Sequence, residues 1–118
     1  MSEISNKPYN LEERTFQFAK AVILYCKKLP KTISSIENCK QVIRSSGSVG
    51  ANYIEANEAL SKKDFVMRIK ISRKEAKETA YWLRLIVETN NEQFKEEGLA
   101  MAQEAVELKK ILSSMLEK

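Results

Sequence analysis

Apolar residues recur every three or four positions along nearly the whole chain, which is the spacing of one face of an α-helix. The pattern breaks at Pro30, around residues 58–60 and at residues 89–91. Long helices joined by such short connections are typical of an up-and-down bundle. The sequence therefore predicts an all-α fold, an antiparallel up-down four-helix bundle. We expect a flexible N-terminus at residues 1–9 and a bundle domain at residues 10–118, with helices at about residues 11–29, 32–57, 62–88 and 92–117.

The ends of the predicted helices carry recognisable signals. Asn10 and Glu13 have the spacing of a capping box, in which each side chain bonds the backbone N–H of the other residue. Pro30 ends the first helix because it lacks the N–H that the next turn needs. Ser61 is a good N-cap for the third helix, and Asp64 would favour the positive end of its dipole.

The middle of the second helix, residues 45–52, reads SSGSVGAN and allows two interpretations. Serine and glycine are common in loops, including loops that cradle phosphate. However, the apolar spacing continues through this stretch without a change of phase, and no lysine follows the glycines. We therefore expect a continuous helix whose small residues let a neighbouring helix approach closely. The expected core face consists of Ile36, Cys39, Ile43, Ser46, Gly50 and Tyr53 or Ile54, with Val42 and Val49 beside it.

The inward stripe of the fourth helix is less sharply defined, because two of its positions have two apolar candidates each. Gly98, near the start of this helix, indicates a kink or a short first turn. The expected stripe consists of Phe94, Leu99 or Met101, Ala102, Val106, Ile111 or Leu112, and Met115.

The third helix has three faces, whereas a simple bundle helix has an apolar stripe and a solvated face. The expected core face consists of Phe65, Ile69, Ser72, Ala76, Ala80, Leu83 and Val87. A second sector holds the basic residues Lys63, Lys70, Arg73, Lys74, Lys77 and Arg84. A third sector holds Met67, Ile71, Trp82 and Leu85, mixed with acidic residues. Exposed apolar residues usually mark an interface, so this third sector favours self-association; the alternative is that Trp82 covers the edge of the core.

Charge is unevenly distributed along a chain whose net charge is +4. Residues 62–84 carry eight lysines and arginines against three acidic residues, a net of +5, and residues 85–118 carry four against seven, a net of −3. A basic face of this kind is either a solvated surface that keeps the bundle soluble or a phosphate-binding stripe. Only Tyr81, at the edge of the stripe, could stack on a base, so sequence-specific readout is not indicated.

A polar strip lies on one side of the second helix. It consists of Arg44, Ser48, Asn52 and Glu55, each separated from the next by the spacing of helical neighbours. One interpretation is a hydrogen-bonded tie between helices or subunits, and the other is contact with a ligand.

Catalytic and metal-binding signatures are absent from the sequence. The chain has no histidine, which removes the commonest general base and transition-metal ligand. Its two cysteines, Cys26 and Cys39, lie on the apolar sides of predicted helices and are expected to be reduced core thiols rather than a disulfide. We expect no enzyme activity, no cofactor and no metal. No apolar run is long enough to span a membrane and no secretory signal is present, so we expect a cytoplasmic protein.

Residues 44–84 carry a more specific pattern. Arg-Ser, Ser-Val, Ala-Asn and Glu are followed by a turn rich in Ser and Lys and by an acidic-Phe pair. The residues concerned are Arg44, Ser45, Ser48, Val49, Ala51, Asn52, Glu55, Ser61, Lys62, Asp64 and Phe65, with Glu75, Ala76, Glu78, Trp82 and Leu83 further on. This pattern resembles the 23S rRNA intervening-sequence proteins, also called S23-like, and the resemblance covers about residues 10–116. Asn57 departs from the pattern, because many members carry Gly there.

The resemblance implies a bundle that forms a ring, a homopentamer. The chain also resembles the accessory variability proteins of diversity-generating retroelements, whose basic rings bind nucleic acid and a reverse transcriptase. By position, the basic residues of the third helix would then contact RNA or DNA, and Arg44 and Glu55 would serve structure or assembly. We expect a non-enzymatic, homo-oligomeric nucleic-acid-binding or accessory protein that works with a nucleic-acid-processing protein. The alternative is an adaptor whose basic stripe docks an acidic partner protein.

Overall fold

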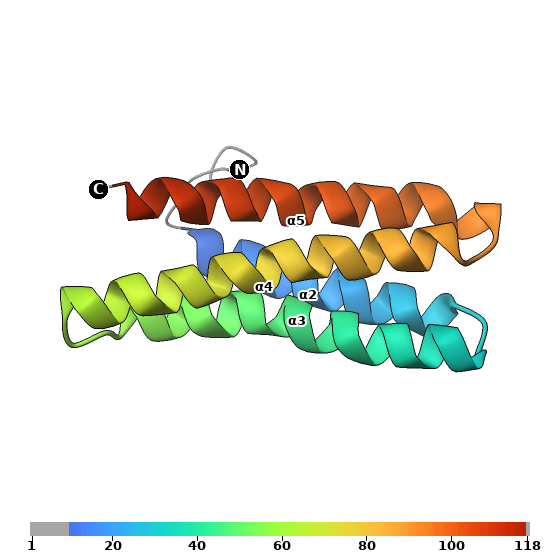
Figure 1. Ribbon diagram of the computed structural model, residues 1–118, viewed down its shortest axis with the longest axis horizontal. Helices are drawn as coiled ribbons and strands as arrows, with labels where there is room; N and C mark the ends of the chain where they lie inside the picture. Colours follow the sequence, from blue (N-terminus) through green and yellow to red (C-terminus); the bar gives the residue numbers. More distant parts are fainter. Residues whose placement is uncertain (1–9, 118) are drawn as a thin grey trace.

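The computed structural model describes residues 10–117, and these form four α-helices and no strand. The helices are α2 (Leu11–Lys28), α3 (Ile33–Asn57), α4 (Lys62–Glu88) and α5 (Lys95–Leu116), and a short 3-10 helix, η2 (Glu92–Phe94), precedes α5. The helices run up and down as an antiparallel bundle, which confirms the predicted fold class (Figure 1). The expected flexible segment, residues 1–9, lies outside the described residues.

Two helices begin with a side-chain cap, one of which was predicted, and a third lacks the cap that was predicted for it. Ser61 caps α4 by accepting a hydrogen bond from the Asp64 N–H at 3.0 Å, as predicted. Thr32 caps α3 in the same way, through the Ser35 N–H. The capping box at Asn10 was wrong: the Asn10 side chain makes no capping hydrogen bond. Its expected partner Glu13 instead accepts a hydrogen bond from Gln17, one turn further along the helix.

The stretch SSGSVGAN is helical throughout, within α3, and no described residue has a positive φ. Its small residues let α3 and α4 pack closely. Ser45 and Thr79 are fully buried and their hydroxyls are 2.8 Å apart. The Ser72 hydroxyl, also fully buried, donates a hydrogen bond to the Val49 carbonyl at 2.6 Å. These buried hydroxyls are tolerated because each has a partner, which removes most of the desolvation penalty.

The core face of α3 agrees with the prediction at Ser46, Gly50 and Tyr53, which are buried, and differs from it elsewhere. Ile36 and Ile43 are 41% and 36% exposed, so their assignment to the core was wrong. The buried face is centred on the two residues predicted to flank it, Val42 and Val49. It also includes Ser35, Ser45, Ser46, Gly50, Tyr53 and Ala56. The hydrogen-bonded serines Ser35 and Ser45 are thus buried on α3, whereas an apolar criterion had favoured Ile36 and Ile43.

The stripe that α5 buries consists of Gly98, Met101, Ala105, Leu108 and Leu112. Met101 and Leu112 were among the predicted alternatives, whereas Leu99, the other candidate at the first of these positions, is 42% exposed. Gly98 lies within the first turn of α5 and marks a point of close approach. A Cβ at this position would lie 2.5 Å from the Tyr25 hydroxyl oxygen and would also overlap Val87. Tyr25 donates a hydrogen bond to the Phe94 carbonyl at 2.8 Å, which ties α2 to the turn before α5.

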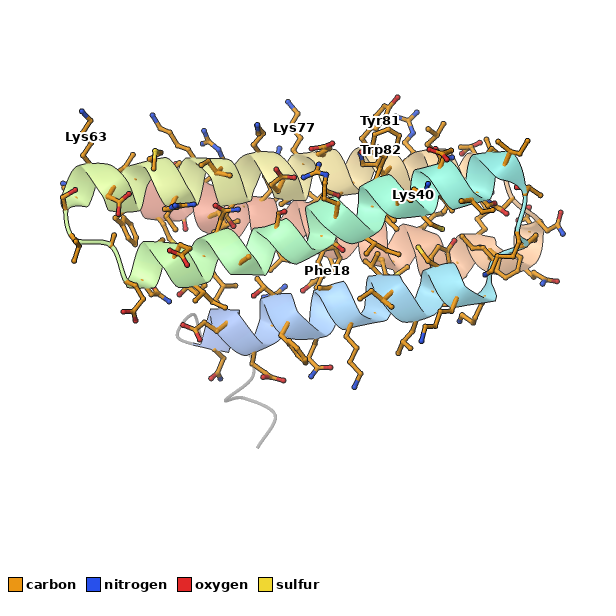
Figure 2. All side chains as sticks on the ribbon, turned by 90° about the horizontal axis from the view of Figure 1, so that it is seen from below. Phe18, Lys40, Lys63, Lys77, Tyr81 and Trp82 are labelled. Atoms are coloured by element: carbon orange, nitrogen blue, oxygen red, sulfur yellow. The ribbon has the colours of Figure 1, made fainter. Side chains whose placement is uncertain are left out.

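The α2 and α3 helices cross closely at one end and separate at the other. At the crossing, a Cβ on Gly50 would lie 2.7 Å from the Thr15 hydroxyl oxygen, so glycine is needed for this approach. Toward the connection around Pro30 the two helices diverge (Figure 2). The divergence opens a groove of about 550 Å³ whose lining includes Ile23, Ile36 and Ile43. Within residues 10–117, no helix is long and apolar enough to cross a membrane.

Candidate nucleic-acid interface

Six basic side chains project from the outer side of α4, and we call them the basic stripe. They are Lys63, Lys70, Arg73, Lys74, Lys77 and Arg84. Arg73 is half-buried and the other five are exposed. Lys63 and Lys77 extend away from the bundle on the same side (Figure 2). From Lys63 to Arg84 the stripe is about 31 Å long, given the rise of an α-helix.

No residue of the basic stripe belongs to an ion pair within residues 10–117. Two ion pairs join α2 to α5: Arg14 makes a two-pronged contact with Glu104 at 2.7 and 2.9 Å, and Lys28 lies 2.5 Å from Glu97. Glu97 and Glu104 of α5 are thus paired with α2 and not with α4. No ion pair joins the basic helix α4 to the acidic helix α5 in the described chain.

The acidic residues in the middle of α4 are turned toward α3. Arg44 contacts Glu78 at 3.1 Å and Glu75 at 3.4 Å. The Trp82 indole N–H donates a hydrogen bond to Glu78 at 3.1 Å. Glu75 is only 8% exposed, and its Oε1 makes no hydrogen bond within the described chain, so the contact with Arg44 is its ion pair there. The outer side of α4 therefore keeps its positive charge.

The ionisation of this cluster follows from its contacts. The hydrogen bond from Trp82, and then the hydrogen bond and charge of Arg44, lower the pKa of Glu78 below its ordinary value of 4.5, although partial burial opposes the shift. Glu75, followed by Glu78, raises the pKa of Arg44. Both shifts favour the charged forms, so Arg44 and Glu78 form an ion pair at neutral pH.

The polar strip of α3 is divided between α4 and the surface. Asn52 donates a hydrogen bond to the Ser48 carbonyl at 2.9 Å and accepts one from Arg68 of α4 at 3.1 Å. Arg44 also reaches α4, through the two glutamates. Glu55 is exposed on the surface of α3. The structure thus brings Arg44 and Asn52, but not Glu55, into the contact between α3 and α4.

The apolar third sector of α4 is more covered than its sequence indicated. Met67 is exposed, whereas Ile71, Trp82 and Leu85 are half-buried. Trp82 packs against the hydrophobic core, as the alternative interpretation had it. Sequence reasoning missed a second apolar surface, the groove between α2 and α3, because it assigned Ile36 and Ile43 to the core. The signal for this groove was the presence of more apolar positions on α3 than one face can bury.

Metal-binding and redox chemistry have little support in the arrangement of side chains. No group of three His, Cys, Asp or Glu residues is placed to hold a metal ion within residues 10–117. Cys26 is buried and Cys39 half-buried, both are free thiols, and both line the α2–α3 groove. Burial, with a contribution from Cys39, raises the pKa of Cys26. A thiol with a raised pKa is a poor nucleophile at neutral pH.

Comparison with known proteins identifies the family of the chain. The sequence matches the family described as 23S rRNA-intervening sequence protein over residues 9–114. It is 31% identical to a protein of unknown function from the S23 ribosomal protein family of Bacteroides thetaiotaomicron VPI-5482, whose crystal structure was determined at 1.70 Å. The similarity covers 93% of this chain and 97% of that chain, with a TM-score of 0.79. No curated protein matches the chain. Since the match to the family spans nearly all of the described bundle, the chain belongs to the 23S rRNA-intervening sequence protein family.

Proposed function

We propose that this protein is a non-enzymatic, homo-oligomeric nucleic-acid-binding protein that contacts phosphates through the basic stripe of α4. The observation that carries the proposal is the absence of an ion pair at all six stripe residues within the described chain. The two glutamates that could neutralise the stripe are held by Arg44 on α3. An unneutralised row of cations about 31 Å long suits a phosphate backbone, which is a row of anions.

Binding through the stripe would depend on charge and not on base sequence. Lysine and arginine displace the counterions condensed on nucleic acid, so affinity falls as salt rises. The described stripe residues lie on one helix face and supply a continuous electrostatic surface. Sequence readout would need side chains directed at base edges, and long flexible lysines are better suited to phosphates.

The decisive experiment reverses three charges at the centre of the stripe, Lys70→Glu, Lys74→Glu and Lys77→Glu. Fluorescence anisotropy with a structured RNA and with duplex DNA, over a range of salt, measures affinity. We expect at least about a tenfold loss of affinity at low salt, and a salt slope reduced by about 2 to 3. The matched control carries the same charge change on the other helices, Lys20→Glu, Lys27→Glu and Lys109→Glu, and should bind more tightly than the stripe variant.

Two outcomes would reject the nucleic-acid proposal. One is the absence of binding by the unaltered protein to either nucleic acid at low salt. The other is an equal loss in the stripe variant and its control, because net charge alone would then explain the effect. If the stripe variant instead loses a protein partner that the unaltered chain retains after nuclease treatment, the adaptor function is favoured.

Self-association is the second part of the proposal, and exposed apolar side chains support it. Ile23, Ile36 and Ile43 are exposed around the α2–α3 groove, and Met67 is exposed on α4. We propose that a second copy of the chain covers one of these surfaces and that the assembly is a ring, a homopentamer, as the family resemblance implies. Such a ring would repeat the basic stripe and could work in the cytoplasm with a nucleic-acid-processing protein.

Size-exclusion chromatography with light scattering tests the assembly and locates its surface. We expect a mass several times that of one chain for the unaltered protein. The double substitution Ile36→Asp and Ile43→Asp tests the groove, and Met67→Asp tests the third sector of α4. The variant that releases monomers identifies the surface. A monomeric unaltered protein at tens of micromolar would contradict self-association.

A further inference from the structure

Tyr81 is a large aromatic side chain exposed within the basic stripe. It is 61% exposed, and it follows Lys70, Lys74 and Lys77 at intervals of four, three and four residues, so it lies in line with them. Its ring and the side chain of Lys77 project on the same side of the bundle (Figure 2). Arg84 lies one turn further along α4 and is also exposed. Cations thus flank the tyrosine on both sides along the helix.

The Tyr81 ring rests on a chain of contacts that extends into the bundle. It meets the Trp82 ring edge-on, with the ring centroids 5.1 Å apart and the planes at 77°. Trp82 is fixed in turn by packing against the core and by its hydrogen bond to Glu78. Glu78 is held by Arg44. An exposed ring with a supported neighbour loses less freedom on binding than an unsupported one.

A second aromatic residue provides a contrast. Phe16 of α2 is also 61% exposed. One turn before it on the same helix lie Glu12 and Glu13, both exposed acids, which would repel a phosphate backbone. Exposure alone therefore does not distinguish the two rings. What distinguishes Tyr81 is its position among unneutralised cations.

From these contacts we infer that Tyr81 is a stacking platform for an unpaired base and gives the stripe a preference for single-stranded nucleic acid. The inference rests on the proposed function and names its substrate class. A base stacked on the ring would leave the adjoining phosphates within reach of Lys77 and Arg84. In a duplex the bases are already stacked on each other, so the ring would gain no partner there. This combination of an aromatic platform and basic side chains is how single strands are bound without sequence preference.

The test compares a single strand of about 12 nucleotides, an oligothymidylate, with a duplex of the same length at the same salt concentration. We expect Tyr81→Ser to weaken binding of the single strand about tenfold and to leave binding of the duplex within about twofold. Tyr81→Phe keeps the ring and should bind both nucleic acids as the unaltered protein does. Phe16→Ser is the matched control and should change neither affinity.

Trp82 supplies an independent readout, because it is the single tryptophan of the chain and touches the Tyr81 ring. The single strand should change its fluorescence more than the duplex does at saturation. Circular dichroism confirms that each variant is folded.

Two results would overturn the inference. Tyr81→Ser could bind the single strand as tightly as the unaltered protein, or Tyr81→Phe could lose as much affinity as Tyr81→Ser, which would assign the effect to the hydroxyl. Either result leaves the stripe intact if the reversal of Lys70, Lys74 and Lys77 still weakens binding to both nucleic acids. Failure of that reversal would instead reject the proposed function itself.

Discussion

One guanidinium nitrogen of Arg44 lies 3.1 Å from each carboxylate oxygen of Glu78, so that α3 holds an acid of α4 by both oxygens. The same nitrogen is 3.4 Å from the buried Oε1 of Glu75. A single arginine thus compensates two of the three acidic residues between positions 62 and 84. This relationship links the stability of the α3–α4 contact to the charge of the outer side of α4.

Replacement of Arg44 by alanine should destabilise the bundle. Glu75 would remain buried without a compensating charge, which costs about 1–3 kcal/mol. Urea denaturation measures the free energy of unfolding. The control is Lys40→Ala, because Lys40 forms an exposed pair with Glu37 at 3.4 Å, and such pairs contribute about 0–1 kcal/mol. An Arg44→Ala variant that keeps its full stability but loses nucleic-acid binding would instead identify Arg44 as a ligand contact.

Acid should weaken the contact made by Glu78. Its pKa in the folded protein lies below the ordinary value of 4.5, chiefly because of the Trp82 hydrogen bond and then Arg44. The resulting stabilisation is complete above pH 4.5 and is lost as the pH falls through the lower, folded-state pKa. We expect Glu78→Gln to lose less stability than the unaltered protein between about pH 6 and pH 3, measured by urea denaturation. Identical losses in the two proteins would contradict this assignment.

Alkaline pH should lower the stability of the folded protein, in part through Tyr25. Burial, followed by the charge of Glu97, raises its pKa to about 12 from the ordinary 10.0. The unfolded chain releases this proton near pH 10.0 while the folded protein retains it, so stability falls as the pH rises through this interval. Tyr25→Phe should remove that part of the alkaline loss.

The same variant should also cost about 1 kcal/mol at neutral pH, because the Phe94 carbonyl loses its hydrogen bond from the tyrosine hydroxyl. The difference in unfolding free energy between the two proteins, measured at neutral and alkaline pH, isolates Tyr25 from other titrating groups. A difference that does not change with pH would show that Tyr25 ionises equally in the folded and the unfolded protein, which contradicts the raised pKa.

Two glycines within helices should respond to alanine in opposite directions. A Cβ on Gly47 would meet no atom within 4 Å, so Gly47→Ala should stabilise the bundle by about 0.5–1 kcal/mol through its higher helix propensity. A Cβ on Gly98 would overlap Val87 and Tyr25, so Gly98→Ala should destabilise it by about 1–3 kcal/mol. Thermal unfolding of the two variants under the same conditions measures the contrast. Equal effects of one sign would contradict the packing described around Gly98.

The sequence was sufficient for the helices and for the core face of α4, but it was insufficient for the rotation of α3. Apolar spacing predicted all four helices, and the continuous phase through residues 45–52 predicted helix where composition suggested a loop. The rotation of α3 was mispredicted because Ser35 and Ser45 are buried with hydrogen-bond partners, Asn90 and Thr79, that only the tertiary structure supplies. Ile36 and Ile43, which were expected in the core, instead line the groove that opens as α2 and α3 diverge.

The candidate site was also predictable only in part, because some of its features depend on one helix and others depend on how the helices pack. Helical spacing placed the six basic residues on one side of α4, since that arrangement depends on one helix alone. The partners of Glu75 and Glu78 were not predictable, because Arg44 lies more than thirty positions away in the sequence and reaches them only through packing of α3 on α4. The support of Tyr81 by Trp82 likewise depends on side-chain orientation.

The absence of acids along the outer side of α4 also affects the protein when nothing is bound. Lys70 and Lys74 are one helical turn apart, as are Arg73 and Lys77, and like charges at this spacing repel by about 0.2–0.5 kcal/mol per pair. The unbound bundle is therefore under electrostatic repulsion along α4, and we expect salt that screens this repulsion to raise its melting temperature. A polyanion bound along the basic stripe, as proposed above, would relieve the same repulsion. Thermal stability and ligand occupancy would then be coupled through one helix.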